Sequence, residues 1–345
     1  MVSILDQHLS ASDFLDPVSE EWGGYIPVPL RYLSLGKEIP FDVFLRVRSR
    51  KKSQVRFILA CAQGYAFKKK WYAKLHDLGL PCLYFSQDDG ENVLGYLDRN
   101  LGNFLSEEKL SQEGKASLLC DVTLLWLRTF FTQEEERTGA RWELALRYID
   151  EFFEIVKRNE AICNLVIHIW RYDHRLFTHC LNTCLFGLAF TTYLDWLGPQ
   201  VRDFALGALL HDAGMTQLPR SIYNKTEKLN LDEWFLVVEH PVLSSELMKK
   251  LPRLRPEVLA MVRQHHENSD GSGYPYGLEK EEINPWARIL RIIDSYEALS
   301  AARSWRPAKT PLEALWVIRD SWQKSNIYDP DYLTAFIKFL GGLKH

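Results

Sequence analysis

The chain has 345 residues, of which 46% are hydrophobic, and its formal net charge is −3. This length is enough for two domains with a sizeable core, and the near-neutral charge excludes a general attraction for nucleic acid or membrane surfaces. Six cysteines lie scattered without the spacing of a disulfide framework, and no basic segment precedes an apolar run at the start. Reduced thiols, a cytoplasmic location and no membrane insertion are therefore expected.

The first part of the chain mixes strand and helix patterns. Runs rich in β-branched and aromatic residues predict short strands, and one segment that ends before a glycine predicts a helix. The expected strands are Tyr25–Pro29, Phe41–Val47, Val55–Ala60 and Leu83–Ser86, and the expected helix is Lys68–Leu78. The basic run Arg46–Lys52 predicts a solvated hairpin turn. The sequence thus predicts a small α+β domain over residues 1–105, with a regulatory or dimer-supporting role.

From about Ser106 onward, apolar residues recur at helical spacing. Two such sets, around Leu118–Trp126 and Leu144–Val156, predict a helical hairpin over residues 106–165. This hairpin links the α+β domain to an all-helical region at residues 166–345. It also offers a surface for a homodimer, and signalling proteins are expected as further partners. The expected fold class is therefore a small α+β domain followed by an all-α bundle.

Seven candidate metal ligands follow in the helical region, and their nitrogen and carboxylate donor atoms suit divalent transition metals. They are His179, His211, Asp212, His240, His265, His266 and Asp294. One ion does not need five histidines and two aspartates, whereas two ions bridged by Asp212 would use all seven. Two neighbouring ions can activate a water and hold a phosphate in line. The pattern predicts a metal-dependent phosphoesterase.

The paired ligands are expected at helix ends. Adjacent residues on a helix point about 100° apart, so a pair such as His211-Asp212 can face one site only near an end or a bend. This pair closes the apolar run Phe204–Leu210, and His265-His266 ends another predicted helix. A lone histidine on an apolar helix is usually structural, and an HD dipeptide alone is a weak signal. The prediction therefore depends on the whole ordered set.

Two segments carry a family resemblance. The segment HDAG at residues 211–214 and the segment HHENSDGSGYP at residues 265–275 resemble the HDxGK and HHExxDGxGYP motifs of the HD-GYP family of bacterial phosphodiesterases. The similarity covers roughly residues 168–314. It implies an all-helical HD-type bundle that hydrolyses the second messenger cyclic di-GMP to linear pGpG, or to GMP after both cuts. In the second segment, Gly271 and Gly273 permit backbone conformations with positive φ.

The resemblance also implies which residues act. The first ion would be held by His179, His211, Asp212 and Asp294, and the second by Asp212, His240, His265 and His266. His211 and Asp212 would be the catalytic pair beside a water that bridges the ions. The substrate contacts would be Tyr274, Gly273, Arg303 and Arg306. Iron or manganese is the expected metal, with zinc, nickel or magnesium as alternatives.

Two positions depart from the family pattern. Met215 stands where the family has the lysine of HDxGK, which removes a cation near the substrate phosphate. Arg175 stands where some members have a glutamate for a third metal, so two ions are expected. Met215 leaves open a degenerate module that binds metal or nucleotide and acts as an effector through partner proteins. A third alternative is an HD-domain phosphohydrolase for another cyclic dinucleotide or a nucleotide monophosphate.

Overall fold

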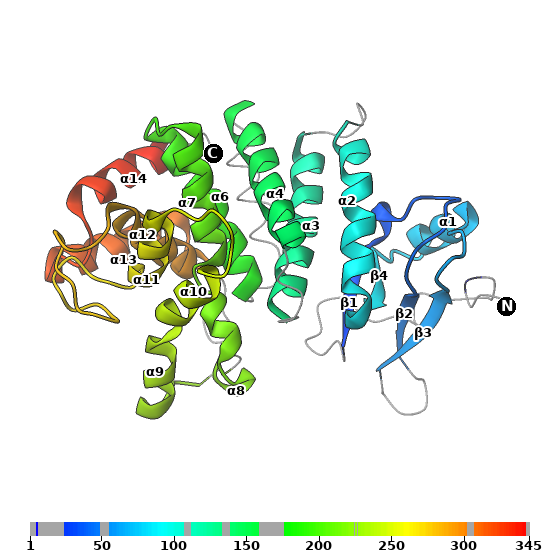
Figure 1. The fold of residues 1–345 in the computed structure, drawn as a ribbon, viewed down its shortest axis with the longest axis horizontal. Coiled ribbons are helices and arrows are strands. Elements are labelled where there is room, and N and C mark those ends of the chain that lie inside the picture. Colours follow the sequence, from blue (N-terminus) through cyan, green and yellow to red (C-terminus); the bar gives the residue numbers. More distant parts are fainter. Residues whose placement is uncertain are drawn as a thin grey trace. The chain divides into compact units, whose positions relative to one another are not determined.

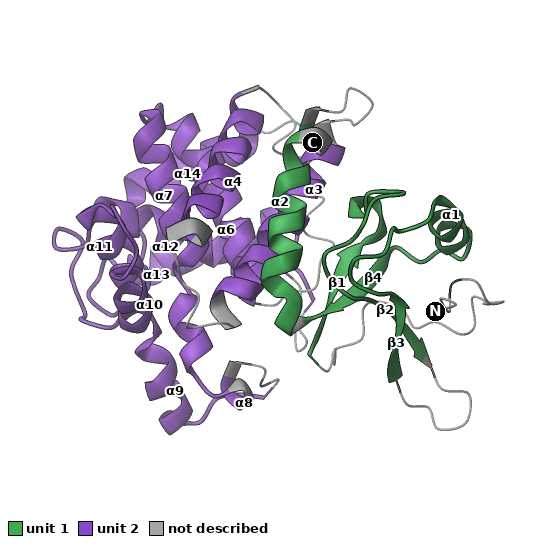
Figure 2. Cartoon of the chain, turned by 45° about the vertical axis from the view of Figure 1, so that its right-hand side comes forward, with its two compact units in different colours: residues 1–110 green, residues 111–345 purple. Residues whose placement is uncertain are grey.

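The computed structural model describes residues 5, 24–48, 55–106, 112–132, 139–158, 176–223, 225, 227–301 and 307–342. Two compact units divide the chain, Met1–Leu110 and Ser111–His345 (Figure 2). The first unit holds a sheet with helices and the second is helical (Figure 1). The predicted fold class, a small α+β part followed by an all-α bundle, is therefore confirmed. The finer division into residues 1–105, 106–165 and 166–345 stays a prediction.

A four-stranded antiparallel sheet forms the centre of unit 1. Its strands are β1 (Tyr25–Pro29), β2 (Val43–Arg48), β3 (Val55–Cys61) and β4 (Cys82–Ser86), in the order β1-β4-β2-β3. The other elements are η3 (Leu30–Tyr32), α1 (Lys69–Asp77), η4 (Gln87–Asp89) and α2 (Gly90–Ser106). Every strand and helix predicted for this part of the chain therefore occurs, with small shifts at the bounds.

The sheet of unit 1 buries apolar side chains because alternate residues of a strand point to the same face. Val43 and Phe85, for example, are fully buried. The predicted solvated turn is wrong for Arg46, which is only 4% exposed. The pairing of β2 with β3 continues beyond Arg46, which lies in the ladder opposite Phe57. Residues 49–52 of that predicted turn lie outside the described residues.

Unit 2 is built from helices. In chain order they are α3 (Gln112–Thr132), α4 (Gly139–Arg158), α6 (Leu176–Tyr193), α7 (Gly198–Leu210), η6 (Ala213–Gln217), α8 (Arg220–Tyr223), α9 (Leu231–Val238), α10 (His240–Met248), α11 (Pro256–Gln264), α12 (Pro285–Ser300), α13 (Pro311–Ser325) and α14 (Pro330–Gly342). Polar caps start several of them, and the Thr310 hydroxyl accepts a hydrogen bond from the backbone N–H of Glu313 at the start of α13. Among the described helices, none is both long and apolar enough to cross a membrane.

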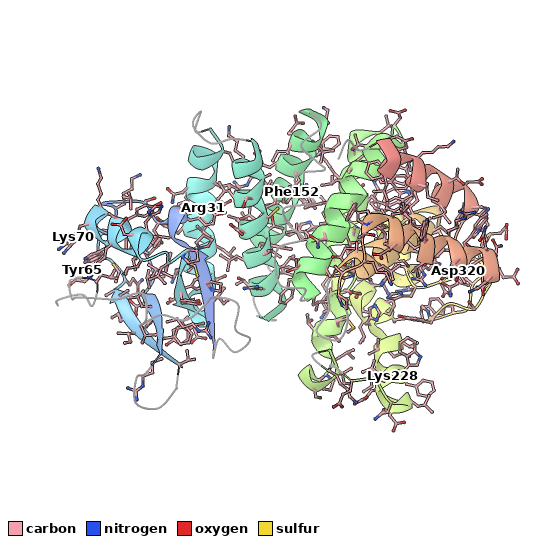
Figure 3. All side chains as sticks on the ribbon, turned by 180° about the vertical axis from the view of Figure 1, so that it is seen from behind. Arg31, Tyr65, Lys70, Phe152, Lys228 and Asp320 are labelled. Carbon is pink, nitrogen blue, oxygen red and sulfur yellow. The ribbon has the colours of Figure 1, made fainter. Side chains whose placement is uncertain are left out.

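The helix α6 lies at the centre of unit 2. Every residue from Thr178 to Thr191 is buried, as expected for a helix that is covered on all sides. The helices α3, α4, α7 and α12 pack against it. Phe152 of α4 is 1% exposed and lies inside this helical unit (Figure 3). The first predicted metal ligand, His179, is therefore carried by the best-buried helix of the bundle.

Candidate metal centre

The seven predicted ligands converge from five places in unit 2. His179 lies in the first turn of α6, while His211 and Asp212 lie between α7 and η6. His240 opens α10, His265 and His266 follow α11, and Asp294 lies within α12. Asp212 and His266 are half-buried and the other five are buried. Helix ends supply six of the seven ligands, which agrees with the prediction from the adjacent pairs.

One group of ligand atoms comes from His179, His211 and Asp294. Nε2 of His179 lies 3.1 Å from Oδ1 of Asp294 and 3.2 Å from Nε2 of His211. The ligand atoms of this group lie within 4.8 Å of one another. Two imidazole nitrogens and a carboxylate oxygen at this spacing suit one divalent transition-metal ion.

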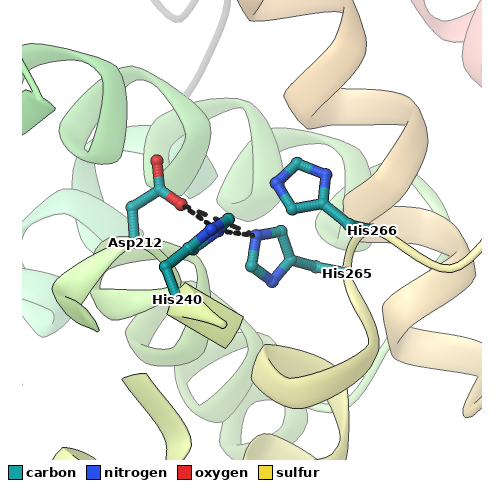
Figure 4. Close-up of side chains that lie close together, drawn as sticks. All are labelled: Asp212, His240, His265 and His266. Atoms are coloured by element: carbon teal, nitrogen blue, oxygen red, sulfur yellow. Dashed lines mark hydrogen bonds and ion pairs between the residues drawn. The ribbon is translucent and has the colours of Figure 1, made fainter. Parts of the chain in front are cut away.

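A second group consists of Asp212, His240, His265 and His266 (Figure 4). Oδ1 of Asp212 lies 3.0 Å from Nε2 of His240 and 3.6 Å from Nε2 of His265. The Nε2 atoms of these two histidines are 3.3 Å apart. Each of the four residues offers a ligand atom within 4.8 Å of the others. The donor set of this group again fits one ion.

Asp212 faces both groups. Its Oδ1 belongs to the second group, while its Oδ2 lies 3.6 Å from Nε2 of His179 and 3.6 Å from Nε2 of His211. Asp294 also reaches across, because its Oδ2 lies 3.9 Å from Nδ1 of His266. A carboxylate with one oxygen toward each group has the geometry of a bridge. The residues therefore fit the predicted pair of ions.

Backbone carbonyls orient three of the imidazoles. Nδ1 of His211 lies 2.8 Å from the carbonyl oxygen of Ala208, that of His240 lies 2.6 Å from Val237, and that of His265 lies 2.6 Å from Val262. A carbonyl oxygen only accepts, so each Nδ1 carries the proton and each Nε2 directs its lone pair into the site. Such contacts fix the tautomer and the ring plane of a ligating histidine.

Glu297 orients a fourth imidazole, and the sequence pattern does not identify it. One oxygen of this carboxylate accepts a hydrogen bond from Nδ1 of His179, and the other accepts one from Nδ2 of Asn182 at 2.7 Å. Glu297 is 1% exposed and lies three residues after Asp294 on α12. This i, i+3 spacing, which places two side chains on one helix face, is the signal that could have found it.

Burial and neighbouring charges set the protonation of the site. Burial lowers the pKa of His211 to about 4 and also lowers the pKa of His266. Burial acts the same way on His179, but the carboxylates of Glu297 and Asp294 outweigh it and raise the pKa of His179 to about 10. Burial opposes ionisation of Asp212, yet the surrounding histidines hold the pKa of this carboxyl well below its usual range. The arrangement favours an ionised Asp212 and neutral His211 and His266, which are the ligand forms.

We expect Glu297→Gln to weaken metal binding at the first group by about 10- to 100-fold, the usual effect of losing a hydrogen-bond partner behind a ligand. The amide keeps the size of the side chain but removes the charge that raises the basicity of His179. Titration against a metal-chelating dye measures the two affinities. Glu313→Gln, an exposed carboxylate at the start of α13, should change neither. Unchanged affinities in Glu297→Gln would reduce this residue to a packing role.

The glycine-rich loop after α11 is held by close backbone packing. Gly271 uses the conformational freedom of glycine and has a φ of +77°. Gly273 is not among the glycines with positive φ. Glycine is needed there because a Cβ would lie 2.2 Å from the backbone nitrogen of Asn268. The carboxylate of Glu267, 2% exposed, accepts a hydrogen bond from the backbone N–H of Tyr276 at 2.7 Å. These contacts fold the loop tightly behind its histidine pair.

A second close approach brings η6 to α10. The backbone N–H of Gly214 donates to Oγ of Ser244 at 2.7 Å. A Cβ at Gly214 would lie only 2.3 Å from the carbonyl oxygen of His240, so no other residue fits without a shift of the backbone. This approach places Asp212 next to His240.

Tyr274 lies against the second group of ligands. Its ring stacks on His266, with centroids 4.7 Å apart and planes at 27°. Trp234 of α9 meets the same ring edge-on at 5.7 Å. Burial, with the carboxylates of Asp212 and Asp294, raises the pKa of Tyr274, so its hydroxyl remains a hydrogen-bond donor. The predicted substrate residue thus lies beside the ligands, and Trp234 is a neighbour that the sequence pattern does not reveal.

Arg291 brings a positive charge to the edge of the site. Its Nη1 lies 3.9 Å from Oδ2 of Asp294 and donates to Oγ of Ser295 at 2.9 Å. Its Nε donates to Oδ1 of Asn268 at 3.0 Å, which ties α12 to the glycine-rich loop. The sequence pattern does not single out Arg291, although it precedes Asp294 by three residues on α12.

Three arginines of the predicted site cannot be compared with the structure, and Met215 can. Arg303, Arg306 and Arg175 lie outside the described residues, and their roles stay predictions. Met215 is described, and lies half-buried in η6. Its backbone N–H donates to the carbonyl oxygen of Asp212 at 2.9 Å. The uncharged side chain therefore branches from the segment that also carries the shared carboxylate.

Several known proteins share sequence with this part of the chain. Residues 183–332 match the HD domain family. Cyclic di-GMP phosphodiesterase PA4108 from Pseudomonas aeruginosa is 28% identical over 226 residues, which are 66% of this chain and 54% of that protein. The cyclic di-GMP phosphodiesterase response regulator RpfG from Xanthomonas campestris is 35% identical over 140 residues, 40% of this chain and 36% of that protein. The 3'3'-cGAMP-specific phosphodiesterase 3 from Vibrio cholerae is 34% identical over 133 residues, which are 39% of this chain and 28% of that protein. The chain thus spans about half or less of the length of these relatives.

A solved structure shares the fold. Bd1817, an HDG"Y"P protein from Bdellovibrio bacteriovorus, matches with a TM-score of 0.66 at 17% sequence identity. The match covers 92% of this chain and 100% of that one. Six of the seven ligands lie within the residues that match the HD domain family, and His179 lies just before them.

Proposed function

Because this chain carries an HD domain and resembles HD-GYP proteins in motif and fold, we propose that it is a metal-dependent phosphodiesterase that hydrolyses cyclic di-GMP to pGpG, GMP or both. One observation carries the proposal, the division of seven ligands into two groups that share Asp212. The names of relatives such as PA4108 and RpfG support the substrate.

The residues of this chain would act mainly by positioning. Divalent ions, if held by the two groups, would make a bound water more acidic and would supply positive charge to hold the phosphate. Asp212 spans both groups and His211 directs its Nε2 toward the first, so we assign these two residues the catalytic role. Phosphoryl transfer needs positioning and charge neutralisation more than covalent chemistry. The contacts with backbone carbonyls hold the rings of His211, His240 and His265 in fixed orientations, which provides this positioning.

Substrate contacts are proposed around this centre. The hydroxyl of Tyr274 is a donor beside the second group, and Gly273 lets the loop backbone approach closely. Arg303 and Arg306, carried over from the family pattern, would offer guanidinium forks to a phosphate. Arg291 adds a guanidinium close to Asp294.

Two other functions have specific support. A relative is named for 3'3'-cGAMP, so a second cyclic dinucleotide is the alternative substrate. Met215 in place of lysine supports an effector that binds metal and nucleotide and contacts partner signalling proteins. The loss of a cation near the phosphate also implies slow turnover in the enzyme, since electrostatic terms are usually the largest in catalysis.

For unit 1 we propose a regulatory role, and for residues 106–165 we propose a contact between two copies of the chain in a homodimer.

Metal reconstitution followed by turnover tests the proposed function. Protein loaded anaerobically with iron or manganese should contain two ions per chain, and chromatography should detect pGpG or GMP from cyclic di-GMP. A parallel incubation with 3'3'-cGAMP ranks the two substrates by kcat/KM. Nucleotide binding without product under both metals would favour the effector. Neither binding nor product would reject both functions.

A further inference from the structure

The eight-residue helix α9 has no buried residue. The two helices that follow it, α10 and α11, both bury part of their surface. Helix α9 extends away from the neighbouring helices (Figure 1). Its large apolar side chains are exposed, with Leu231 at 75%, Trp234 at 44%, Phe235 at 66% and Leu236 at 45%. Exposed apolar side chains that cluster in this way commonly mark a binding surface. One of these side chains, Trp234, lies close to the predicted metal ligands.

Trp234 connects this surface to the metal ligands. Its ring contacts Tyr274, and Tyr274 stacks on His266 of the second group. Two ring contacts thus lead from a ligand to an indole that remains partly exposed to solvent. Trp234 also lines a shallow depression with Lys228, Leu229, Asn230, Leu231 and Asp232. Lys228 is labelled at this end of the unit in Figure 3.

Tyr274 is less suited than Trp234 to receive a nucleobase. One face of its ring is covered by His266, and the indole of Trp234 meets it in a T-shaped arrangement. The side chain is only half-buried as a whole, but its ring already has partners on two sides. The indole is the larger ring, has the greater exposed fraction, and lies farther from the ligands. A base attached to a phosphate at the ligands would meet the indole if it extends outward past Tyr274.

We propose that Trp234 is the stacking platform for a purine base of a cyclic dinucleotide whose phosphate lies at the metal centre. The inference rests on the proposed function. It assigns two tasks to Tyr274: its ring supports His266, and its hydroxyl donates a hydrogen bond. Stacking recognises the π-face that every base has. Trp234 therefore contributes affinity for cyclic dinucleotides as a class and does not distinguish guanine from adenine.

Binding measurements with Trp234 variants test the inference. Manganese-loaded protein is titrated with a non-hydrolysable phosphorothioate analogue of cyclic di-GMP. Trp234→Ala should raise Kd by about 5- to 150-fold, the effect of losing one stacked base, and Trp234→Phe should recover most of the loss. KM for cyclic di-GMP should rise more than kcat falls. The effect should be of similar size for 3'3'-cGAMP, because stacking tolerates either base.

A matched control and the metal content separate the possible outcomes. Phe235→Ala removes an equally apolar and more exposed ring one position along the same helix, and it should leave Kd unchanged. Trp234→Ala protein should retain two ions per chain. An unchanged Kd in Trp234→Ala, with wild-type turnover intact, overturns the base platform alone. Loss of metal in Trp234→Ala would show that the indole supports Tyr274, and this result also overturns the base platform. Wild-type protein that neither binds nor cleaves a cyclic dinucleotide overturns the proposed function and the platform together.

Discussion

Asp212→Ala should lower the metal content from two ions per chain toward none and reduce phosphodiesterase activity to background. One oxygen of Asp212 faces His179 and His211, and the other faces His240 and His265. Its loss therefore removes a ligand from each group at once. The effect should exceed the roughly 10- to 100-fold cost of losing a contact behind a ligand. Elemental analysis of reconstituted protein and chromatographic product detection measure it.

The control for Asp212→Ala is Asp320→Ala. Asp320 lies on α13, is exposed, and pairs with Lys324 on the same helix (Figure 3). This variant should keep both ions and full activity, because a surface ion pair contributes little. Retention of one full equivalent of metal in Asp212→Ala would show that the two groups bind independently, and the assignment of a bridge would be withdrawn.

Gly214→Ala should destabilise the fold and weaken the second metal group. The new Cβ would lie 2.3 Å from the carbonyl oxygen of His240 and 2.7 Å from the backbone nitrogen of Ser244. Both are backbone atoms, so η6 and α10 must move apart, and overpacking of this kind typically costs about 1–3 kcal/mol. The movement also increases the distance between Asp212 and His240, now 3.0 Å at the ligand atoms. Thermal unfolding and metal titration measure the two effects.

Gly341→Ala is the matched control for Gly214→Ala. Gly341 lies near the end of α14, and a Cβ there would meet no atom within 4 Å. Alanine at such a helical position should be neutral or slightly stabilising. Equal Tm values for the two variants would contradict the close approach between η6 and α10.

The convergence of the seven predicted ligands could be predicted because it depends on residue type and order. Paired histidine and aspartate side chains at the ends of apolar runs predict convergence on one site, and the structure brings all seven together. Asn182 was not predictable in this way, and Glu297 only through its i, i+3 spacing from Asp294. Their role depends on which face of α12 packs against α6, and that is decided by tertiary packing. Trp234 was not predictable either, because only the fold places it beside Tyr274.

Details of backbone conformation could also not be predicted from the sequence. The motif indicates that Gly273 must be glycine, but the reason is the nearness of Asn268 rather than a positive φ. Likewise, the composition of Arg46–Lys52 predicts a turn, whereas Arg46 belongs to a strand ladder. Charged residues can lie in strands when neighbouring side chains cover them, so composition alone misplaces the boundary.

The inward-facing imidazoles have a consequence for folding. Nε2 of His179 lies 3.2 Å from Nε2 of His211, and Nε2 of His240 lies 3.3 Å from Nε2 of His265. In the second pair, the carbonyl contacts direct two nitrogen lone pairs toward each other, an arrangement that repels unless a cation lies between them. The folded bundle therefore offers a divalent ion a ligand geometry that the unfolded chain lacks. If metal binds as proposed, mass action makes the supply of metal in the cell part of what sets the thermodynamic stability of this bundle.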